Sequence, residues 1–135
     1  MDKKRSDCPI SCSLDIIGDK WSLLIIRDVM LRGKMSYSEF LSSEERIATN
    51  ILVSRLTILE GEKILVKDVS PKNKSKYIYS LTQKGADLLP IMIELMDWGA
   101  KYNKNCPRKE LGQKIKRDKA AVIRELSDTL KDKVK

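Results

Sequence analysis

The spacing of apolar residues changes abruptly at Gly61, and this change restricts the folds open to the chain. Before it, Leu52, Leu56 and Leu59 repeat at intervals of four and three, the spacing that buries one face of a helix. After it, residues 64–69 are rich in β-branched and apolar side chains, residues 70–74 have turn composition, and residues 77–81 alternate. The sequence therefore predicts a helix followed directly by a β-hairpin with a basic loop.

Three helical segments are predicted before this unit. Ser13 is positioned to cap a short first helix that ends at Gly18. Apolar positions in residues 21–29 recur at helical spacing and predict a second helix that ends near Gly33. Residues 36–39 have the spacing of a capping box, which predicts a short third helix. This order predicts a mostly α fold with a small β-hairpin wing, a winged helix-turn-helix with flanking helices.

Two more helical segments are predicted after the hairpin. Thr82 is expected to cap a long helix through Trp98, kinked at Pro90 because proline lacks an amide donor and clashes with the preceding turn. From residue 109 a basic amphipathic helix is predicted, whose stripe we expect to pack on a partner subunit. The alternatives for this tail are the DNA backbone, an anionic membrane or partial disorder. The stripe consists of Leu111, Ile115, Val122, Leu126, Leu130 and Val134.

The distribution of charge divides the chain into two parts. The formal net charge is +8, but residues 1–100 hold 15 basic and 14 acidic side chains, whereas residues 101–135 hold 12 and 5. We therefore predict a winged-helix domain over 1–105 and a basic helical extension over 106–135, with DNA contacts confined to a local patch.

The same totals argue against several classes of protein. Without histidine the chain lacks the usual zinc ligand and general base, and it has no Gly-rich phosphate loop. We therefore expect no enzyme activity, no metal and no cofactor. No apolar run reaches the roughly 20 residues that span a bilayer, and the charged N-terminus leads into no signal-peptide core. A cytoplasmic protein without membrane contact is expected.

Six short blocks, at consistent intervals over residues 8–99, resemble the HxlR-type helix-turn-helix family of bacterial regulators. The resemblance implies a dimer formed through the first and last helices, and a protein that represses or activates promoters. In some members of that family, the cysteine before the N-terminal proline senses oxidants or electrophiles. The blocks are Cys8-Pro9, Gly18-Asp19-Lys20-Trp21, Tyr37-Ser38-Glu39-Phe40, Leu52-x-x-x-Leu56-x-x-Leu59, Tyr79-Ser80-Leu81-Thr82-x-x-Gly85 and Trp98-Gly99.

Lys63 departs from the family pattern, which usually has glycine just before the first wing strand. Gly61 stands two residues earlier. A lysine at positive φ would cost about 1 kcal/mol, so we expect the end of the preceding helix to be remodelled.

The outer face of the helix before the hairpin carries the candidate base-reading residues. Asn and Arg side chains can form paired hydrogen bonds with base edges, and Val or Thr methyl groups can contact thymine. An ordinary solvated helix face is the alternative. The candidates are Thr49, Asn50, Val53, Ser54 and Arg55.

Lysines in and around the hairpin are the candidate phosphate contacts. They would add affinity for DNA that does not depend on the base sequence. Alternatively, or in addition, they protect the hairpin from edge-to-edge aggregation. The residues are Lys67, Lys72, Lys74 and Lys76, opposed only by Asp68.

Cys8 is the candidate redox sensor. Its closeness in sequence to Lys3, Lys4 and Arg5 is expected to lower the pKa of the thiol and make it reactive. Oxidation at a dimer interface would then change the spacing of two recognition helices, through a Cys8–Cys12 bridge or an intersubunit bridge. The alternative is a small buried residue without a redox role.

Trp21 and Trp98 could line a ligand pocket, but their apolar helical stripes favour anchors of the core or of an interface. No small-molecule effector can be named from the sequence.

Together these features predict a homodimeric, sequence-specific regulator, acting as a repressor on double-stranded DNA with half-sites about 34 Å apart. A winged-helix module that contacts a protein in place of DNA is the first rival. A cysteine-dependent enzyme, the second, lacks a base in this sequence.

Overall fold

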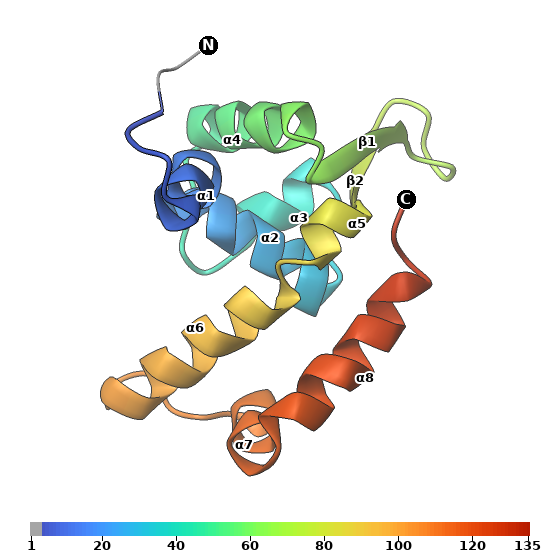
Figure 1. Cartoon of the computed structure of the whole chain (residues 1–135). Helices are drawn as coiled ribbons and strands as arrows, with labels where there is room; N and C mark the ends of the chain where they lie inside the picture. The colour runs from blue at the N-terminus through green and yellow to red at the C-terminus, as the bar shows by residue number, and fades with distance from the viewer. Residues whose placement is uncertain (1–3) are drawn as a thin grey trace.

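The computed structural model of the chain describes residues 4–135, which form eight helices around one two-stranded antiparallel sheet (Figure 1). Within this range no helix combines the length and apolar character needed to cross a membrane. The elements are α1 (Pro9–Ile17), α2 (Lys20–Arg32), α3 (Tyr37–Leu41), α4 (Thr49–Gly61), β1 (Leu65–Val69), β2 (Tyr77–Leu81), α5 (Gln83–Ala86), α6 (Leu89–Tyr102), α7 (Glu110–Arg117) and α8 (Lys119–Lys131).

The core of the winged helix lies where α2, α4 and the hairpin meet. Ile26, Leu52 and Leu59 are fully buried, and Phe40 of α3 and Leu65 of β1 are 1% exposed. In the hairpin, Leu65 pairs with Leu81 and Val69 with Tyr77, so the strands are in continuous antiparallel register. These contacts confirm the predicted winged helix-turn-helix with its small hairpin wing.

Local signals set both ends of α2 and the start of α3, and the signals at Gly33 and Ser36 are those predicted. The Asp19 carboxylate accepts a hydrogen bond from the Ser22 amide at 2.9 Å and caps α2. At the other end Gly33 takes φ +65°, which glycine adopts without steric cost. Ser36 and Glu39 form both hydrogen bonds of the capping box that starts α3.

The first helix begins earlier than predicted. Pro9 stands at the start of α1 and Cys8 is its N-cap, whereas Ser13 lies inside the helix and donates its hydroxyl to the Pro9 carbonyl at 2.8 Å. The expectation that Ser13 caps α1 is therefore wrong. Proline favours the first helical turn, because its missing amide has no partner there anyway.

The junction between α4 and β1 keeps the strained geometry that the sequence argues against. Helix α4 runs to Gly61, and Lys63 itself takes φ +60°. The expected remodelling of the helix end is therefore wrong. The close packing that follows explains why the junction is rigid: a Cβ added at Gly85 would lie 2.4 Å from the Ile64 carbonyl oxygen.

Replacing Lys63 by glycine is expected to raise the free energy of unfolding by about 1 kcal/mol, because glycine adopts this φ without the Cβ clash. Urea unfolding followed by circular dichroism measures the change. Lys63→Ala is the matched control, since it removes the same side chain and keeps the Cβ. Equal stability of the two variants would show that φ strain is not what limits this junction.

The segment after the hairpin is two helices, and the prediction of one kinked helix is wrong. The Thr82 hydroxyl accepts from the Gly85 amide at 3.1 Å and caps α5, a helix of only four residues. Pro90 stands in the first turn of α6, where a missing amide costs nothing. Proline therefore helps to start α6 where we expected it to bend a longer helix.

The C-terminal extension folds back on its own chain. Asp118 separates α7 from α8 and caps α8 by accepting from the Ala121 amide at 3.1 Å. Ile115, Val122 and Leu130 are buried, because α7 and α8 pack on α6 and α8 also packs on α5. The stripe is thus covered within one chain, which corrects both the single helix and the packing on a partner subunit that we expected.

Candidate nucleic-acid interface

The outer face of α4 brings four of the predicted base-reading residues together. Thr49, Asn50, Val53 and Ser54 are exposed, with Val53 at 50%, while Leu52 and Leu56 hold the opposite face in the core. Thr57 extends the same face, and its hydroxyl donates to the Val53 carbonyl at 2.8 Å. The sequence analysis missed Thr57, although its place one turn after Val53 is a usable signal.

Arg55 lies apart from these four. It is half-buried, and its Nε is 3.5 Å from the Asp19 carboxylate at the start of α2. Burial alone would raise the pKa of Asp19, but hydrogen bonds from Ser22 and the Arg55 charge lower it. The Arg55 side chain therefore braces α4 against α2.

A buried ion-pair network ties the turn between α3 and α4 to α2. The Arg27 guanidinium donates to both oxygens of Glu45, at 2.7 and 2.9 Å, and to Asp28 at 2.8 and 3.1 Å. Asp28, which is 3% exposed, also accepts from the Ser43 hydroxyl. The hydrogen bond from Arg27 lowers the pKa of Glu45, which favours the charged form of this carboxylate. The sequence analysis missed this network.

A second pair flanks the network on its solvent side. The Arg32 guanidinium donates to both oxygens of Glu44 at 3.0 Å and lowers the pKa of that carboxyl to about 2. Arg46 follows with φ +56°, three residues before the start of α4. The ion pairs of Glu44 and Glu45 with arginines of α2 thus hold the turn that leads into α4.

The wing projects from the helical body, as Figure 1 shows for the loop beyond β1 and β2. Asn73 organises the loop by accepting from the amide and the hydroxyl of Ser75, at 3.0 and 2.7 Å. The ammonium of Lys67 lies 4.2 Å from the centroid of the Tyr77 ring, a cation–π contact. All four predicted lysines, Lys67, Lys72, Lys74 and Lys76, are exposed.

A groove of about 410 Å³ runs between the wing and the start of α3 and the middle of α4. Its walls carry hydroxyl groups, two lysines and the edges of aromatic rings. The lining residues are Ser36, Tyr37, Ser38, Val53, Leu56, Lys67, Ser75, Lys76, Tyr77 and Tyr79. Val53 of the exposed α4 face and the wing lysines Lys67 and Lys76 thus line one concave surface.

Cys8 is exposed at the N-cap of α1. Hydrogen bonding from the Ser11 and Ile10 amides lowers the pKa of its thiol. The neighbouring cations are engaged elsewhere, since Lys4 pairs with Asp7 at 2.7 Å and Arg5 with Asp15 at 2.9 Å. The helix end is therefore the cause of the lowered pKa in the described residues, where the sequence analysis expected the basic residues to act. Lys3 lies outside the described residues.

The other two cysteines are also free. The Cys12 thiol donates to the Ser6 carbonyl at 3.4 Å, and Cys106 is exposed in the loop after α6.

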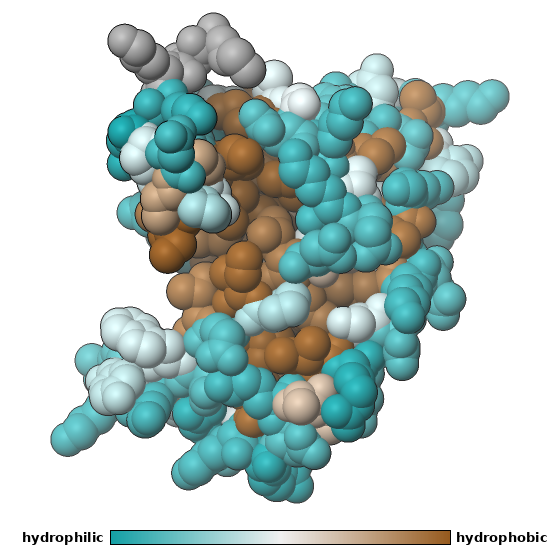
Figure 2. Space-filling view, in the orientation of Figure 1, coloured by the Kyte–Doolittle hydropathy of each residue, from teal (hydrophilic) through white to brown (hydrophobic). Residues whose placement is uncertain are grey.

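An apolar face on α1 and α6 is left exposed. Figure 2 shows apolar surface gathered in the hollow between these two helices. Trp98, which is 68% exposed, and Tyr102 lie together with ring centroids 5.8 Å apart, so Trp98 is not a core residue. The exposed side chains are Ile10 and Leu14 of α1 and Ile91, Leu95, Trp98 and Tyr102 of α6.

The comparisons with known proteins agree with this architecture. Residues 16–107 match the HxlR-like helix-turn-helix family. Bacillus subtilis YdeP, an uncharacterised HTH-type transcriptional regulator, is 32% identical over 79% of this chain and 83% of its own. The redox regulator HypR in its reduced form has a TM-score of 0.64 and 31% identity, over 73% of this chain and 96% of HypR.

The reduced form of the transcriptional regulator YodB from Bacillus subtilis is also similar, with a TM-score of 0.58 and 28% identity, over 74% of this chain and 98% of YodB. The family match covers α2 to α6 completely and stops before α7. It confirms the resemblance that the six sequence blocks indicate. The chain is a member of the HxlR-like helix-turn-helix family of transcriptional regulators.

Proposed function

We propose that this regulator is a homodimeric repressor that binds a specific double-stranded DNA site in the cytoplasm and is not an enzyme. The observation that carries the proposal is the concave surface that Val53 of α4 lines together with Lys67 and Lys76 of the wing. A recognition helix entering a major groove and a wing beside it are the parts of a winged-helix DNA contact.

The α4 face supplies the base contacts in this proposal. Asn50 can form paired hydrogen bonds with adenine, and the methyl groups of Thr49 and Val53 can contact thymine. Ser54 adds a hydroxyl that donates or accepts. Because Arg55 is held by Asp19, it acts here by positioning α4, and the base contacts rest on the other four residues.

The wing supplies phosphate contacts. Lys72, Lys74 and Lys76 lie at the exposed tip, and Lys67 lines the groove. These cations add affinity that falls as salt rises and does not depend on sequence.

The second copy of the chain covers the apolar face of α1 and α6. Ile91, Leu95, Trp98 and Tyr102 recur at steps of four, three and four along α6, the spacing of a helix–helix contact. The extension covers the other side of α6, so this stripe is what α6 has left to offer a partner.

The protein is first used to select its preferred duplex from a pool of random DNA. Variants are then compared on the selected and on a scrambled duplex, which separates base contacts from phosphate contacts. Asn50→Ala is expected to weaken binding to the selected duplex by about tenfold or more and to leave scrambled DNA unchanged. Lys74→Ala is expected to weaken both duplexes alike and to reduce the salt slope by about one. Fluorescence anisotropy over a salt series measures both.

Selection that yields no preferred duplex, together with weak and steeply salt-dependent binding to all DNA, would contradict this proposal. It would favour the winged-helix module that contacts a protein.

We also propose that Cys8 makes the regulator responsive to oxidants. HypR, which shares this fold, is named a redox regulator. YodB, which also shares it, is named a transcriptional regulator and has been solved in a reduced and in a diamide-treated form. In this chain the support is the exposed Cys8 thiol with its lowered pKa at the start of α1, next to the apolar face. Diamide takes two electrons and two protons from two thiols, which join in a disulfide.

Cys8→Ser is expected to abolish the effect of diamide on binding to the selected duplex, because the most reactive thiolate is gone. Cys12→Ser, one turn along α1, separates the two possible bridges: the response is lost with Cys12 if the bridge is Cys8–Cys12, and it is kept if Cys8 bridges to the partner subunit's Cys8. Anisotropy before and after diamide, with non-reducing electrophoresis, shows whether a bridge forms within or between chains. A Cys8→Ser protein that responds like the wild type would remove Cys8 from this role.

A further inference from the structure

A cavity of about 660 Å³ lies where the end of α6 meets α7 and the start of α8. Its volume falls within the range of small-molecule sites. In Figure 1, α7 lies at the end of the molecule opposite to α4 and the wing, so the cavity is remote from the concave DNA surface. The lining residues are Asp97, Ala100, Lys101, Arg108, Ile115, Lys116 and Lys119.

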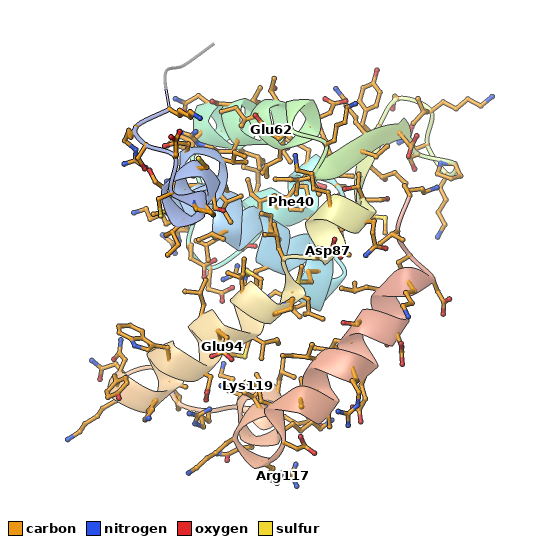
Figure 3. The ribbon with its side chains drawn as sticks, in the orientation of Figure 1. Phe40, Glu62, Asp87, Glu94, Arg117 and Lys119 are labelled. Atoms are coloured by element: carbon orange, nitrogen blue, oxygen red, sulfur yellow. The ribbon has the colours of Figure 1, made fainter. Side chains whose placement is uncertain are left out.

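Two of the four cations in the lining are held by acidic partners. The Asp97 carboxylate accepts from Arg108 at 2.8 Å and from Lys119 at 2.7 Å. Lys119 also reaches Glu94 at 3.1 Å, as Figure 3 shows. The Arg108 guanidinium is further fixed by the Gly112 carbonyl at 3.2 Å. These bonds give the cavity a rigid wall.

The other two cations, Lys101 and Lys116, form no ion pair with any residue in 4–135. The segment that carries them, residues 101–117, holds seven basic side chains and one acidic one. Even with Glu94 counted beside Asp97, four cations face two carboxylates. The cavity therefore has a surplus of positive charge, and two ammonium groups are available to a ligand.

We propose that this cavity binds a small soluble polyanion with two or more phosphate or carboxylate groups, which Lys101 and Lys116 contact directly. Lys101 comes from α6 and Lys116 from α7, so a ligand with two separated anionic groups can engage both. Charge-assisted hydrogen bonds of this kind are the strong ones. Ala100 and the buried Ile115 supply an apolar floor for the body of the ligand. This site is independent of the proposed DNA contacts.

The test uses pyrophosphate and citrate as probes of the full chain, titrated by calorimetry at constant ionic strength. We expect one saturable site per chain for at least one probe. The variant Lys101→Gln with Lys116→Gln is expected to weaken that binding by about tenfold or more. The matched control is Lys104→Gln with Lys109→Gln, which removes the same charge from exposed positions outside the cavity.

Unchanged affinity in the control, with the loss confined to the cavity variant, supports the site. Equal losses in both variants would overturn it, because they would show diffuse attraction by the basic segment. Absence of saturable binding for both probes would overturn it as well. If the cavity variant instead weakens binding to scrambled duplex DNA more than the control does, these lysines contact the DNA backbone and the small-molecule site is wrong.

Discussion

Asp28→Ala is expected to lower the free energy of unfolding by about 3 kcal/mol, the largest stability effect that we expect from one substitution. Asp28 is 3% exposed and accepts hydrogen bonds from Arg27 and Ser43. Its removal leaves a largely buried guanidinium with fewer partners and a buried hydroxyl without its acceptor. A buried polar group without a partner lowers the free energy of unfolding by more than its hydrogen bond contributes.

Urea unfolding measures this loss, and the control is Asp128→Ala. Asp128 also forms an ion pair, with Lys131, but its side chain is 77% exposed, and exposed pairs contribute about 0–1 kcal/mol. If the two alanine variants are equally stable, the buried network does not hold the α3–α4 turn in place.

Leu95→Glu is expected to convert the proposed dimer to a monomer and to weaken binding to the selected duplex by about a hundredfold or more. Leu95 is 48% exposed at the middle of the α6 stripe, and burying a carboxylate there in an apolar contact is costly. A monomer loses the gain in affinity that two linked half-sites provide, which reaches 10²–10⁴-fold.

Sedimentation velocity measures the dimer, and anisotropy measures the DNA affinity. Met35→Glu is the matched control for sedimentation, since Met35 is 42% exposed in the loop between α2 and α3. A Leu95→Glu protein that sediments as a dimer would show that the second copy docks elsewhere.

The sequence predicts the winged helix well, because each of its elements carries a local signal. The capping box at Ser36, the glycine at Gly33 and the turn at residues 70–74 act within a few residues, and the structure confirms all three segments. The exposed α4 residues follow from the same reasoning, since helical spacing alone divides a helix into two faces.

The predictions that fail depend on contacts between distant residues. Arg27 and Glu45 are 18 residues apart, and no local pattern pairs them. Lys63 keeps a positive φ because packing at Ile64 and Gly85 outweighs its own preference. The tail stripe indicates that these side chains are buried, but it does not indicate which surface covers them. In the structure, α6 of the same chain covers them.

The return of the tail to the wing has a consequence for local opening of the structure. The Lys135 amide donates to the Leu81 carbonyl at 3.0 Å, but α7 and α8 pack mainly on each other, on α6 and on α5. The core of α2, α4 and the hairpin is held by its own contacts. We therefore expect the tail to open as a separate cooperative unit without unfolding the winged helix. Amide hydrogens of α8 are then expected to exchange sooner than those of α2.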